Sequence, residues 1–360
     1  MSLSQPKRIL IIKLRHHGDV LLSTPVVDAL KTRFPDCEID MLVYAGTEQL
    51  IADNPQIAQI LTIDRNWKKL GVFKQLACEK NLFSKLKARD YDWAFNLSDQ
   101  WRAAIIAKLC ARCSVGFDCI KRDGFWWRFC HDFINHELDP SHHIVENQLN
   151  ILAPLIQPED VADAKVRLWV AQDARESMRQ KLREQGWNGE DYVLLHPGAR
   201  WHFKCWEDGK NAAIVQLLLN SGQNVVLTAS PDNVEQYMLQ EIIGRLNIPE
   251  GGKVWVLSGC LSLRELAAAI EGAKLFIGVD SAPMHIAAAL DKPQIALFGA
   301  SWVDKWRPYS EQAEVIYAGD YAELPHPDSI DTNDPTRLLK AIPLQDVWDR
   351  ISAKLEALEA

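Results

Sequence analysis

Short apolar runs alternate with longer amphipathic stretches along the first half of the chain. Runs with few polar residues indicate buried strands at residues 8–14, 39–44 and 93–97. Apolar residues at helical spacing indicate helices at residues 20–34, 72–88 and 101–110. This rhythm predicts a parallel sheet with crossover helices.

The alternation begins again after an irregular segment at residues 118–140, a helix at 143–155 and a linker near 154–164. The strands predicted there are residues 192–196, 224–228, a stretch near 254, 275–278 and 294–298. The helices predicted there are residues 173–185, a helix ending at 220, 234–246, 262–271, a helix beginning near 281, and a last helix at about 344–358. We therefore expect an α/β fold of two doubly wound, Rossmann-like domains that face each other across a cleft, over residues 1–165 and 172–342.

Composition narrows the class of protein. Apolar residues make up 48% of the chain and charged residues 24%, as in folded proteins. The net charge of −8 argues against a general nucleic-acid binder, so any anionic partner must be met by local cations. The apolar run after Lys7 and Arg8 is too short for a signal peptide, and no stretch is suited to spanning a bilayer. We expect a cytoplasmic protein.

The cysteines and the acidic pairs give little reason to expect a metal. Among eight cysteines only Cys110 and Cys113 form a C-x-x-C pair, and a zinc site would need a second pair. Asp90 and Asp92 have the D-x-D spacing that can hold a divalent ion. They precede a strand, however, and should lie at the edge of the sheet opposite to the ligands. No P-loop, G-x-G-x-x-G, G-x-S-x-G or H-E-x-x-H motif is present.

The turn after the first predicted strand holds candidate acid–base groups. It runs from Arg15 through His16, His17 and Gly18 to Asp19, directly before a predicted helix. Asp19 stands where a helix-capping residue is expected, and a carboxylate there is also suited to accept a hydroxyl proton as a general base. His16 and His17 are alternative bases, and spacing does not separate the three.

Two later turns carry groups suited to phosphate. The loop at residues 196–206 places Arg200 and Lys204 at the predicted carboxyl edge of the second sheet, a pattern suited to a diphosphate. Asp280 and Ser281 end another strand before a helix of small residues, whose unpaired N–H groups suit a phosphate. The structural alternatives are an ordinary charged loop and a capped helix with a buried His285.

The segment from Trp101 to Arg128 differs in charge from the whole chain. It holds six cations against Asp118 and Asp123, together with Phe125, Trp126 and Trp127. Such a surface suits a partner that is both anionic and amphiphilic. A solvated helix face beside a packed aromatic loop is the alternative.

Together these motifs resemble those of the ADP-heptose:lipopolysaccharide heptosyltransferases, glycosyltransferase family 9. The resemblance runs from Lys7 to about Tyr321. It rests on residues 18–20 with Pro25, on HPGARWHFKCW at 196–206, and on GVDSAPMHIAAAL at 278–290. The segments most similar to the heptosyltransferase III type, which adds the branching heptose of the inner core, are residues 96–101, 203–206, 306–309 and 318–321.

The resemblance implies a GT-B fold with an N-terminal acceptor-binding domain and a C-terminal domain that binds a nucleotide sugar. It further implies inverting transfer of L-glycero-D-manno-heptose from ADP-heptose to a heptose of the lipopolysaccharide inner core, with ADP as product. No cofactor or metal is expected. A peripheral contact with the inner membrane surface is expected, and the helix at residues 343–360 should pack back on the N-terminal domain.

The resemblance also assigns roles to residues. Asp19 matches the catalytic base and Lys204 the lysine that meets the donor phosphates, while Glu235 is expected at the ADP ribose. The expected donor-binding residues are Gly198, Ala199, Arg200, Lys204, Ser230, Glu235, Asp280, Ser281, Ala282, Met284 and His285. The expected acceptor-binding residues are His16, His17, Trp101, Arg102, Lys121 and Arg122. Heptosyltransferases I and II commonly carry small hydroxyl residues where His16 and His17 stand, which is a departure of this sequence.

Three other functions fit parts of the same pattern. A heptosyltransferase of type I or II would differ in its acceptor. A nucleotide-sugar epimerase with the same two-domain architecture would turn over the donor without an acceptor. In a non-catalytic nucleotide-sugar or glycan-binding protein, Asp19 would be only a helix cap.

Overall fold

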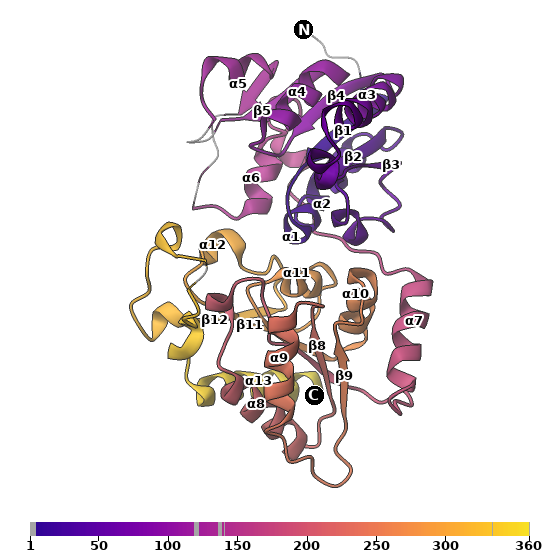
Figure 1. Ribbon diagram of the computed structural model, residues 1–360. Coiled ribbons are helices and arrows are strands. Elements are labelled where there is room, and N and C mark those ends of the chain that lie inside the picture. The colour runs from indigo at the N-terminus through magenta and orange to yellow at the C-terminus, as the bar shows by residue number, and fades with distance from the viewer. Residues whose placement is uncertain (1–4, 119–121, 136–138, 140, 333, 360) are drawn as a thin grey trace. The chain divides into compact units, whose positions relative to one another are not determined.

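The computed structural model describes residues 5–118, 122–135, 139, 141–332 and 334–359. The chain divides into two compact units, with the boundary between Trp169 and Val170. Each unit is an α/β domain built on a six-stranded sheet (Figure 1). All strand pairings in the two sheets are parallel among the residues described.

The first domain has the strand order β3-β2-β1-β4-β5-β6, so the order reverses between β1 and β4. Its strands are β1 (Arg8–Lys13), β2 (Glu38–Tyr44), β3 (Gln59–Ile63), β4 (Tyr91–Asn96), β5 (Ala111–Phe117) and β6 (Phe133–Asn135). Its α-helices are α1 (His17–Leu21), α2 (Thr24–Arg33), α3 (Val72–Ala88), α4 (Trp101–Cys110), α5 (Phe125–Phe129) and α6 (Ile144–Asn150). Its 3₁₀ turns are η1 (Thr47–Leu50), η2 (Arg65–Lys69) and η3 (Pro158–Asp160).

The second domain repeats this topology with the order β12-β11-β10-β7-β8-β9, reversing between β7 and β10. Its strands are β7 (Val193–His196), β8 (Val225–Ala229), β9 (Val254–Ser258), β10 (Leu275–Val279), β11 (Gln294–Phe298) and β12 (Ala313–Tyr317). Its α-helices are α7 (Gln172–Arg183), α8 (Asp208–Asn220), α9 (Asn233–Ile243), α10 (Leu263–Gly272), α11 (Ala282–Ala289), α12 (Val303–Trp306) and α13 (Leu344–Glu359). Its 3₁₀ turns are η4 (His202–Lys204), η5 (Ala318–Asp320), η6 (Pro327–Ser329) and η7 (Leu338–Ala341). In both sheets the reversal point is where doubly wound folds bind ligands, beyond the carboxyl ends of the strands.

The predicted helix at residues 20–34 is in fact two helices. α1 ends at Leu21 and α2 begins at Thr24, with Pro25 in the first turn of α2. A proline inside a helix removes an N–H donor and its ring clashes with the carbonyl four residues earlier, here that of Leu21. The break leaves α1 as a separate short helix that follows β1.

Four strands of the structure, β3, β5, β6 and β12, were not predicted. β3 and β12 lie at sheet edges and are only partly buried, so their sequences lack a continuous apolar run. β5 follows α4 without an intervening turn, and β6 has only 3 residues. None of the described helices is both long and apolar enough to cross a membrane.

The C-terminal helix differs from the expectation. Val347, Ile351 and Leu355 of α13 are buried in the hydrophobic core of the second domain, and the Tyr321 hydroxyl donates to Asp346 at 2.8 Å. The prediction that this helix packs back on the N-terminal domain is therefore wrong. Its apolar residues recur every four positions, and this stripe is buried on the domain that immediately precedes it in the chain.

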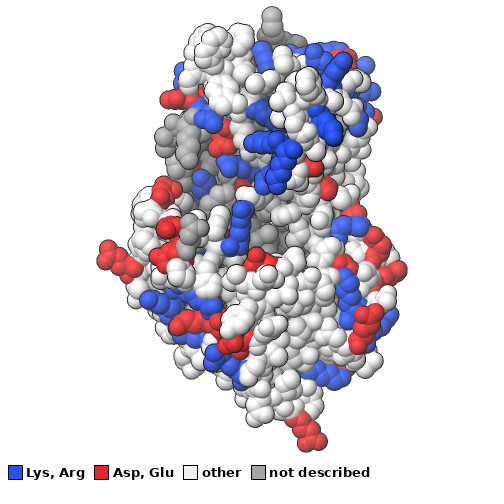
Figure 2. Space-filling model, in the orientation of Figure 1, with Lys and Arg blue, Asp and Glu red and all other residues white. Residues whose placement is uncertain are grey.

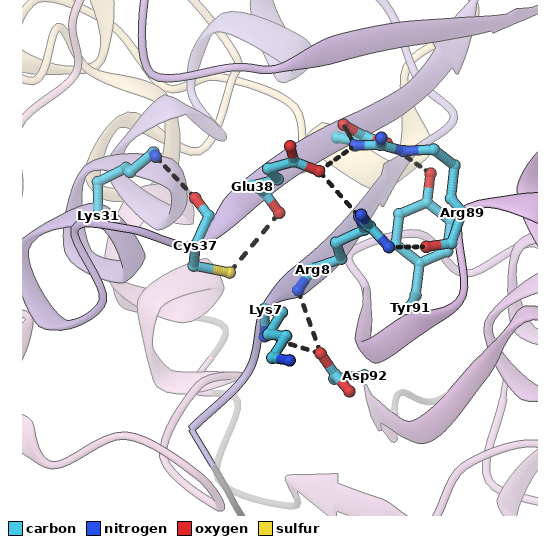
Figure 3. Close-up of polar contacts among 9 residues, drawn as sticks. Lys7, Arg8, Lys31, Cys37, Glu38, Arg89, Tyr91 and Asp92 are labelled. Carbon is cyan, nitrogen blue, oxygen red and sulfur yellow. Dashed lines mark hydrogen bonds and ion pairs between the residues drawn. The ribbon is translucent and has the colours of Figure 1, made fainter.

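A network of charges ties together the amino ends of the first domain's central strands (Figure 3). Asp40 of β2 is fully buried, and it accepts hydrogen bonds from Arg89 at 2.7 and 3.1 Å and from the Tyr91 hydroxyl at 2.7 Å. Glu38 accepts from both Arg8 and Arg89, at 2.9 and 3.0 Å. Burial and the Asp40 carboxylate raise the pKa of Tyr91, which therefore stays protonated as a donor.

Candidate functional site

Asp19 lies at the reversal point of the first sheet, in the segment of residues 15–19 that leads from β1 into α1 (the Asp19 turn). It is the third residue of α1, and the residue that precedes the helix is His16, whose side chain does not cap it. The Asp19 carboxylate is half-buried and makes no hydrogen bond or ion pair with any residue that the structure describes. The simple capping role is therefore wrong, and the carboxylate is available to a ligand.

The turn that holds Asp19 is fixed to the neighbouring strand-to-helix turn after β4. The Leu14 N–H donates to the Ser98 hydroxyl at 2.7 Å, and the Gln100 amide donates to the Leu14 carbonyl at 2.8 Å. Arg15 pairs with Asp99 at 2.8 Å. The sequence motif 96–101 was singled out only by resemblance. Its side chains hold the turn that carries Asp19, because β1 and β4 are adjacent strands.

The two histidines beside Asp19 differ in environment. His16 is exposed, whereas His17 is half-buried, and its Nδ1 is buried without a hydrogen-bond partner among the described residues. Burial, together with His16, lowers the pKa of His17. His17 is thus neutral near pH 7 and remains an alternative acceptor of a proton.

Lys204 and Asp280 meet at the reversal point of the second sheet. They come from the turns after β7 and β10, adjacent strands that pair His196 with Gly278. The Lys204 ammonium donates to Asp280 at 2.6 Å, with side-chain exposures of only 16% and 7%. It also lies 5.1 Å from the centre of the Trp201 ring. Two residues expected to bind one donor thus share a well-shielded ion pair.

The start of α11 stands beside that ion pair in the chain. Ser281 precedes the helix, and its hydroxyl donates to the Val279 carbonyl rather than capping the helix. Pro283 has no N–H and the Met284 N–H donates to the Ser281 carbonyl at 3.1 Å, so the Ala282 N–H is the first-turn group that keeps the partial positive charge favouring a phosphate. Met284 and His285 are buried in this helix. Arg200 is exposed, 5.7 Å from the centre of the Trp201 ring.

Glu235 of α9 is a buried carboxylate that lies beside the residues following β8 and beside the turn after β7. Glu235 is 7% exposed, accepts from the Ser230 N–H at 2.9 Å, and lies 3.7 Å from His196 Nε2. A Cβ on Gly198 would stand 2.4 Å from Glu235 Oε2, so only glycine allows this close approach. Burial lowers the pKa of His196, with Glu235 opposing the shift, and Thr228 bonds its other nitrogen at 2.9 Å.

His196 is the member of this group whose role sequence reasoning missed. The sequence shows its position as the last residue of a predicted strand. Its partners, Thr228 and Glu235, come from β8 and α9 and are not apparent from the sequence. A polar residue at that position is the signal that could have found it.

Four cations of the basic segment from Trp101 to Arg128 form ion pairs, three of them with acids outside the segment. Arg102 pairs with Glu79 of α3, and Lys108 pairs with Asp132. Arg112 pairs with Asp90 and Asp92, at 2.6 and 3.3 Å, and Arg128 pairs with Asp118 at 2.8 Å. The local excess of cations in the sequence therefore does not describe the folded surface.

Two members of the predicted acceptor group remain close to the Asp19 turn. Arg122 donates to the Asp99 carbonyl at 2.9 Å and lies 5.8 Å from the centre of the Trp101 ring. Trp101 is 42% exposed and packs edge-on against Trp127. Lys121 falls outside the described residues.

The structure shows the surroundings of the Cys110–Cys113 pair and of the D-x-D pair. Cys110 and Cys113 are buried free thiols, and burial raises the pKa of each to about 11. Asp92 accepts from the backbone of Lys7 at 2.7 Å, at the amino edge of the sheet (Figure 3). Within the described part of the chain, no three His, Cys, Asp or Glu residues are grouped to hold a metal ion.

Comparison with known proteins identifies relatives over nearly the full length. Residues 80–336 match Glycosyltransferase family 9 (heptosyltransferase). The chain is 38% identical over 335 residues to lipopolysaccharide heptosyltransferase 3 of Escherichia coli, covering 93% of this chain and 95% of that protein.

Two solved structures share the fold. The glycosyltransferase family 9 protein of Veillonella parvula has a TM-score of 0.83 at 22% identity, with 99% of each chain covered. The E. coli ADP-heptose lps heptosyltransferase II has a TM-score of 0.77 at 22% identity, covering 98% of this chain and all of the other. The expected GT-B class, with two parallel-sheet α/β domains, is confirmed.

Proposed function

Because the chain belongs to glycosyltransferase family 9, we propose that it transfers L-glycero-D-manno-heptose from ADP-heptose to a heptose of the lipopolysaccharide inner core, as a heptosyltransferase of type III. The observation that carries this proposal is the 38% identity to lipopolysaccharide heptosyltransferase 3, which extends over 93% of the chain. The geometry at the two reversal points supports separate roles for the two domains, acceptor activation in the first and donor binding in the second.

In the proposed mechanism Asp19 is the general base. It accepts the proton of an acceptor hydroxyl, whose oxygen attacks the anomeric carbon from the face opposite to ADP. The new C–O bond forms as the bond to the β-phosphate breaks, and ADP leaves with the electron pair, so the configuration inverts. The transition state is oxocarbenium-like, as in glycoside hydrolysis. The Asp19 carboxylate is half-buried and has no partner among the residues that the structure describes, which suits this role better than a capping role.

The proposed donor site uses charges that the second domain already holds in place. An ammonium has three N–H donors, so Lys204 can keep its bond to Asp280 and still donate to the β-phosphate. The Ala282 N–H at the start of α11 would meet the same phosphate as negative charge builds on it. Glu235, next to Gly198 and Ser230, is the proposed acceptor for the ribose hydroxyls. The chain's own cations thus supply the compensation for which other transferases use a metal.

The acceptor in this proposal is anchored by a lipid. The proposal therefore includes a cytoplasmic enzyme that contacts the inner membrane surface. Trp101 and Arg122 are the proposed acceptor contacts nearest the Asp19 turn, since Arg122 bonds the carbonyl of the Asp99 that holds Arg15.

One experiment separates the candidate functions. The protein is incubated with ADP-heptose, with and without a truncated, phosphorylated core acceptor; mass spectrometry detects transfer and ADP release, and NMR detects an epimer of the donor, which has the same mass. A type III transferase adds one heptose to an acceptor that already holds two, and releases ADP. Transfer only to acceptors lacking the first or second heptose would indicate type I or II. Donor turnover without acceptor would indicate an epimerase, and binding without turnover a non-catalytic protein.

A further inference from the structure

The amino-terminal half of α3 exposes large apolar side chains. Phe73 is 90% exposed, Val72 71% and Leu76 59%. Of the 17 residues of this helix only Leu82 and Leu86 are buried, and both lie in its second half. The first two turns of α3 therefore bury no apolar side chain in the first domain, although such exposure disfavours the folded protein in water.

The same segment is strongly basic. Arg65, Lys68, Lys69 and Lys74 stand between Asp64 and Glu79 with no acid among them, in a chain whose net charge is −8. The two lysines of η2 and Lys74 are exposed, and no hydrogen bond or ion pair to a described residue involves their ammonium groups. The cations of the 101–128 segment, by contrast, are mostly paired. Among the described residues of the first domain, unpaired cations are thus concentrated on α3 and η2.

The neighbouring helices extend this apolar surface. On α4, exposed apolar residues recur every four positions at Trp101, Ile105 and Leu109, with 42%, 42% and 55% exposure. On α5, the exposed residues are Phe125, Trp126 and Phe129, with 72%, 70% and 61% exposure.

Contacts join the three helices into one surface. Arg102 of α4 pairs with Glu79 of α3, and Trp101 packs on Trp127 of α5 at 5.5 Å between ring centres. The three helices lie along the same end of the first domain, with α4 between α3 and α5 (Figure 1). Figure 2 shows Lys and Arg side chains gathered over the α3 side of this domain and an uncharged surface over α5.

We propose that this surface docks on an anionic lipid bilayer. Phe73, Val72 and the aromatic residues of α5 enter the headgroup region, while Lys68, Lys69 and Lys74 contact anionic headgroups. Aromatic and aliphatic side chains flanked by lysines are the pattern of interfacial membrane binding. The inference rests on the proposed function in one respect, because a lipid-anchored acceptor gives the docking its use.

Charge complementarity selects the bilayer over a second copy of the chain. A symmetric dimer through the start of α3 would bring the same lysines together from both copies, with no acid in the segment to compensate. A bilayer rich in phosphatidylglycerol offers the opposite charge, and each cation near such a surface strengthens binding roughly fivefold.

The test is co-sedimentation of the full chain with phosphatidylcholine vesicles, with and without phosphatidylglycerol, at low and high salt. We expect binding only to the anionic vesicles, weakened by salt. Phe73→Ser should lower the affinity by at least about tenfold, since it removes a large inserted side chain. Lys68→Glu with Lys69→Glu should abolish binding.

Two matched controls are available. Val234→Ser removes an apolar side chain that is 57% exposed on the second domain. Lys85→Glu with Lys87→Glu makes the same charge change on the same helix, about 16 Å or more beyond Lys74, a distance greater than the Debye length of about 10 Å at 0.1 M salt, where this control is compared. Both should bind vesicles like the original protein. Heptose transfer to a deacylated acceptor in solution should be unchanged in all four variants.

Full vesicle binding by Phe73→Ser, or equal losses in both charge variants, would overturn the proposal. So would a fall in oligomer mass on Phe73→Ser, which would assign the surface to a second copy. Vesicle binding as expected without any heptose transfer would count against the proposed function and would leave the docking surface supported.

Discussion

The carboxylates at the amino edge of the first domain's sheet contrast with Asp19 at its carboxyl edge. At the amino edge, Glu38, Asp40 and Asp92 all accept hydrogen bonds from arginines, a tyrosine or backbone N–H groups (Figure 3). At the carboxyl edge, Asp19 is half-buried and has no such partner among the described residues. A carboxylate that is fully paired holds strands together, whereas one left unpaired in a fixed turn is available to react. The comparison predicts that substitutions at the two edges separate stability from catalysis.

The largest effect should follow Asp19→Asn. The amide keeps the shape of the side chain but does not accept a proton, so kcat should fall about 10²- to 10⁴-fold, the usual range for a general base. Calorimetry should give unchanged ADP affinity, and the melting temperature should hold, because no described contact is lost. Steady-state kinetics with the core acceptor measures the change. Near-normal turnover would move the base to His17, and His17→Gln is then the variant to examine.

Arg89→Met at the amino edge should have the reverse effect. It leaves the buried Asp40 with Tyr91 as its remaining side-chain donor, and loss of one partner of a buried pair costs about 3 kcal/mol or more. Urea denaturation should show that loss in the free energy of unfolding. The turnover number at a temperature where the variant stays folded should be unchanged. An Arg89→Met protein with an unchanged free energy of unfolding and a reduced turnover number would contradict the distinction between the two edges.

Lys204→Met tests whether a paired charge at a carboxyl edge is structural or functional. It removes a proposed phosphate contact, and a charged hydrogen bond of about 1.5–3 kcal/mol corresponds to roughly 10- to 100-fold weaker ADP binding. It also leaves Asp280, which is only 6% exposed, without its Lys204 partner, and so should lower the free energy of unfolding. The double variant with Asp280→Asn should recover stability but not ADP affinity. If both recover together, the pair only supports the fold.

Much of this arrangement was predictable because it depends on local sequence. The alternation of strands and helices indicated the fold class, and the position of a turn after a strand placed Asp19, Lys204 and Asp280 at carboxyl edges. Spacing did not predict that Lys204 would pair with Asp280, because these residues are 76 positions apart and meet only since β7 and β10 are neighbours in the sheet.

Charge counting along the sequence failed for a related reason. The excess of cations between Trp101 and Arg128 is compensated by Glu79, Asp90 and Asp132, which lie outside the segment. The basic segment around η2 is shorter but keeps its charge, because no acid among the described residues pairs with Lys68, Lys69 or Lys74. A count within a window does not include tertiary neighbours, and this limits what sequence alone says about a surface.

Gly198→Ala should weaken ADP binding by roughly tenfold, the effect of a small displacement of one buried hydrogen-bonding group. The added methyl would stand 2.4 Å from Glu235 Oε2, so the carboxylate that faces Ser230 must move. Gly209→Ala is the matched control, since a Cβ there meets nothing within 4 Å. It lies inside α8 and should be neutral or slightly stabilising. Calorimetric titration with ADP distinguishes them, and equal affinities would remove Glu235 from the donor site.

The smallest effect is expected for Arg122→Gln. The same substitution at Arg112 allows arginines at the two edges of the sheet to be compared. Arg122 stands beside Asp99 and Trp101 at the carboxyl edge, whereas Arg112 pairs with Asp90 and Asp92 at the amino edge. Loss of one solvent-accessible cation near a phosphorylated acceptor should raise the acceptor KM about fivefold, with kcat and ADP affinity unchanged. Arg112→Gln, which removes the same charge from the same domain, should leave the acceptor KM unchanged. Equal shifts in both variants would mean that the acceptor responds to the overall field of the domain, and Arg122 would then lose its place at the acceptor site.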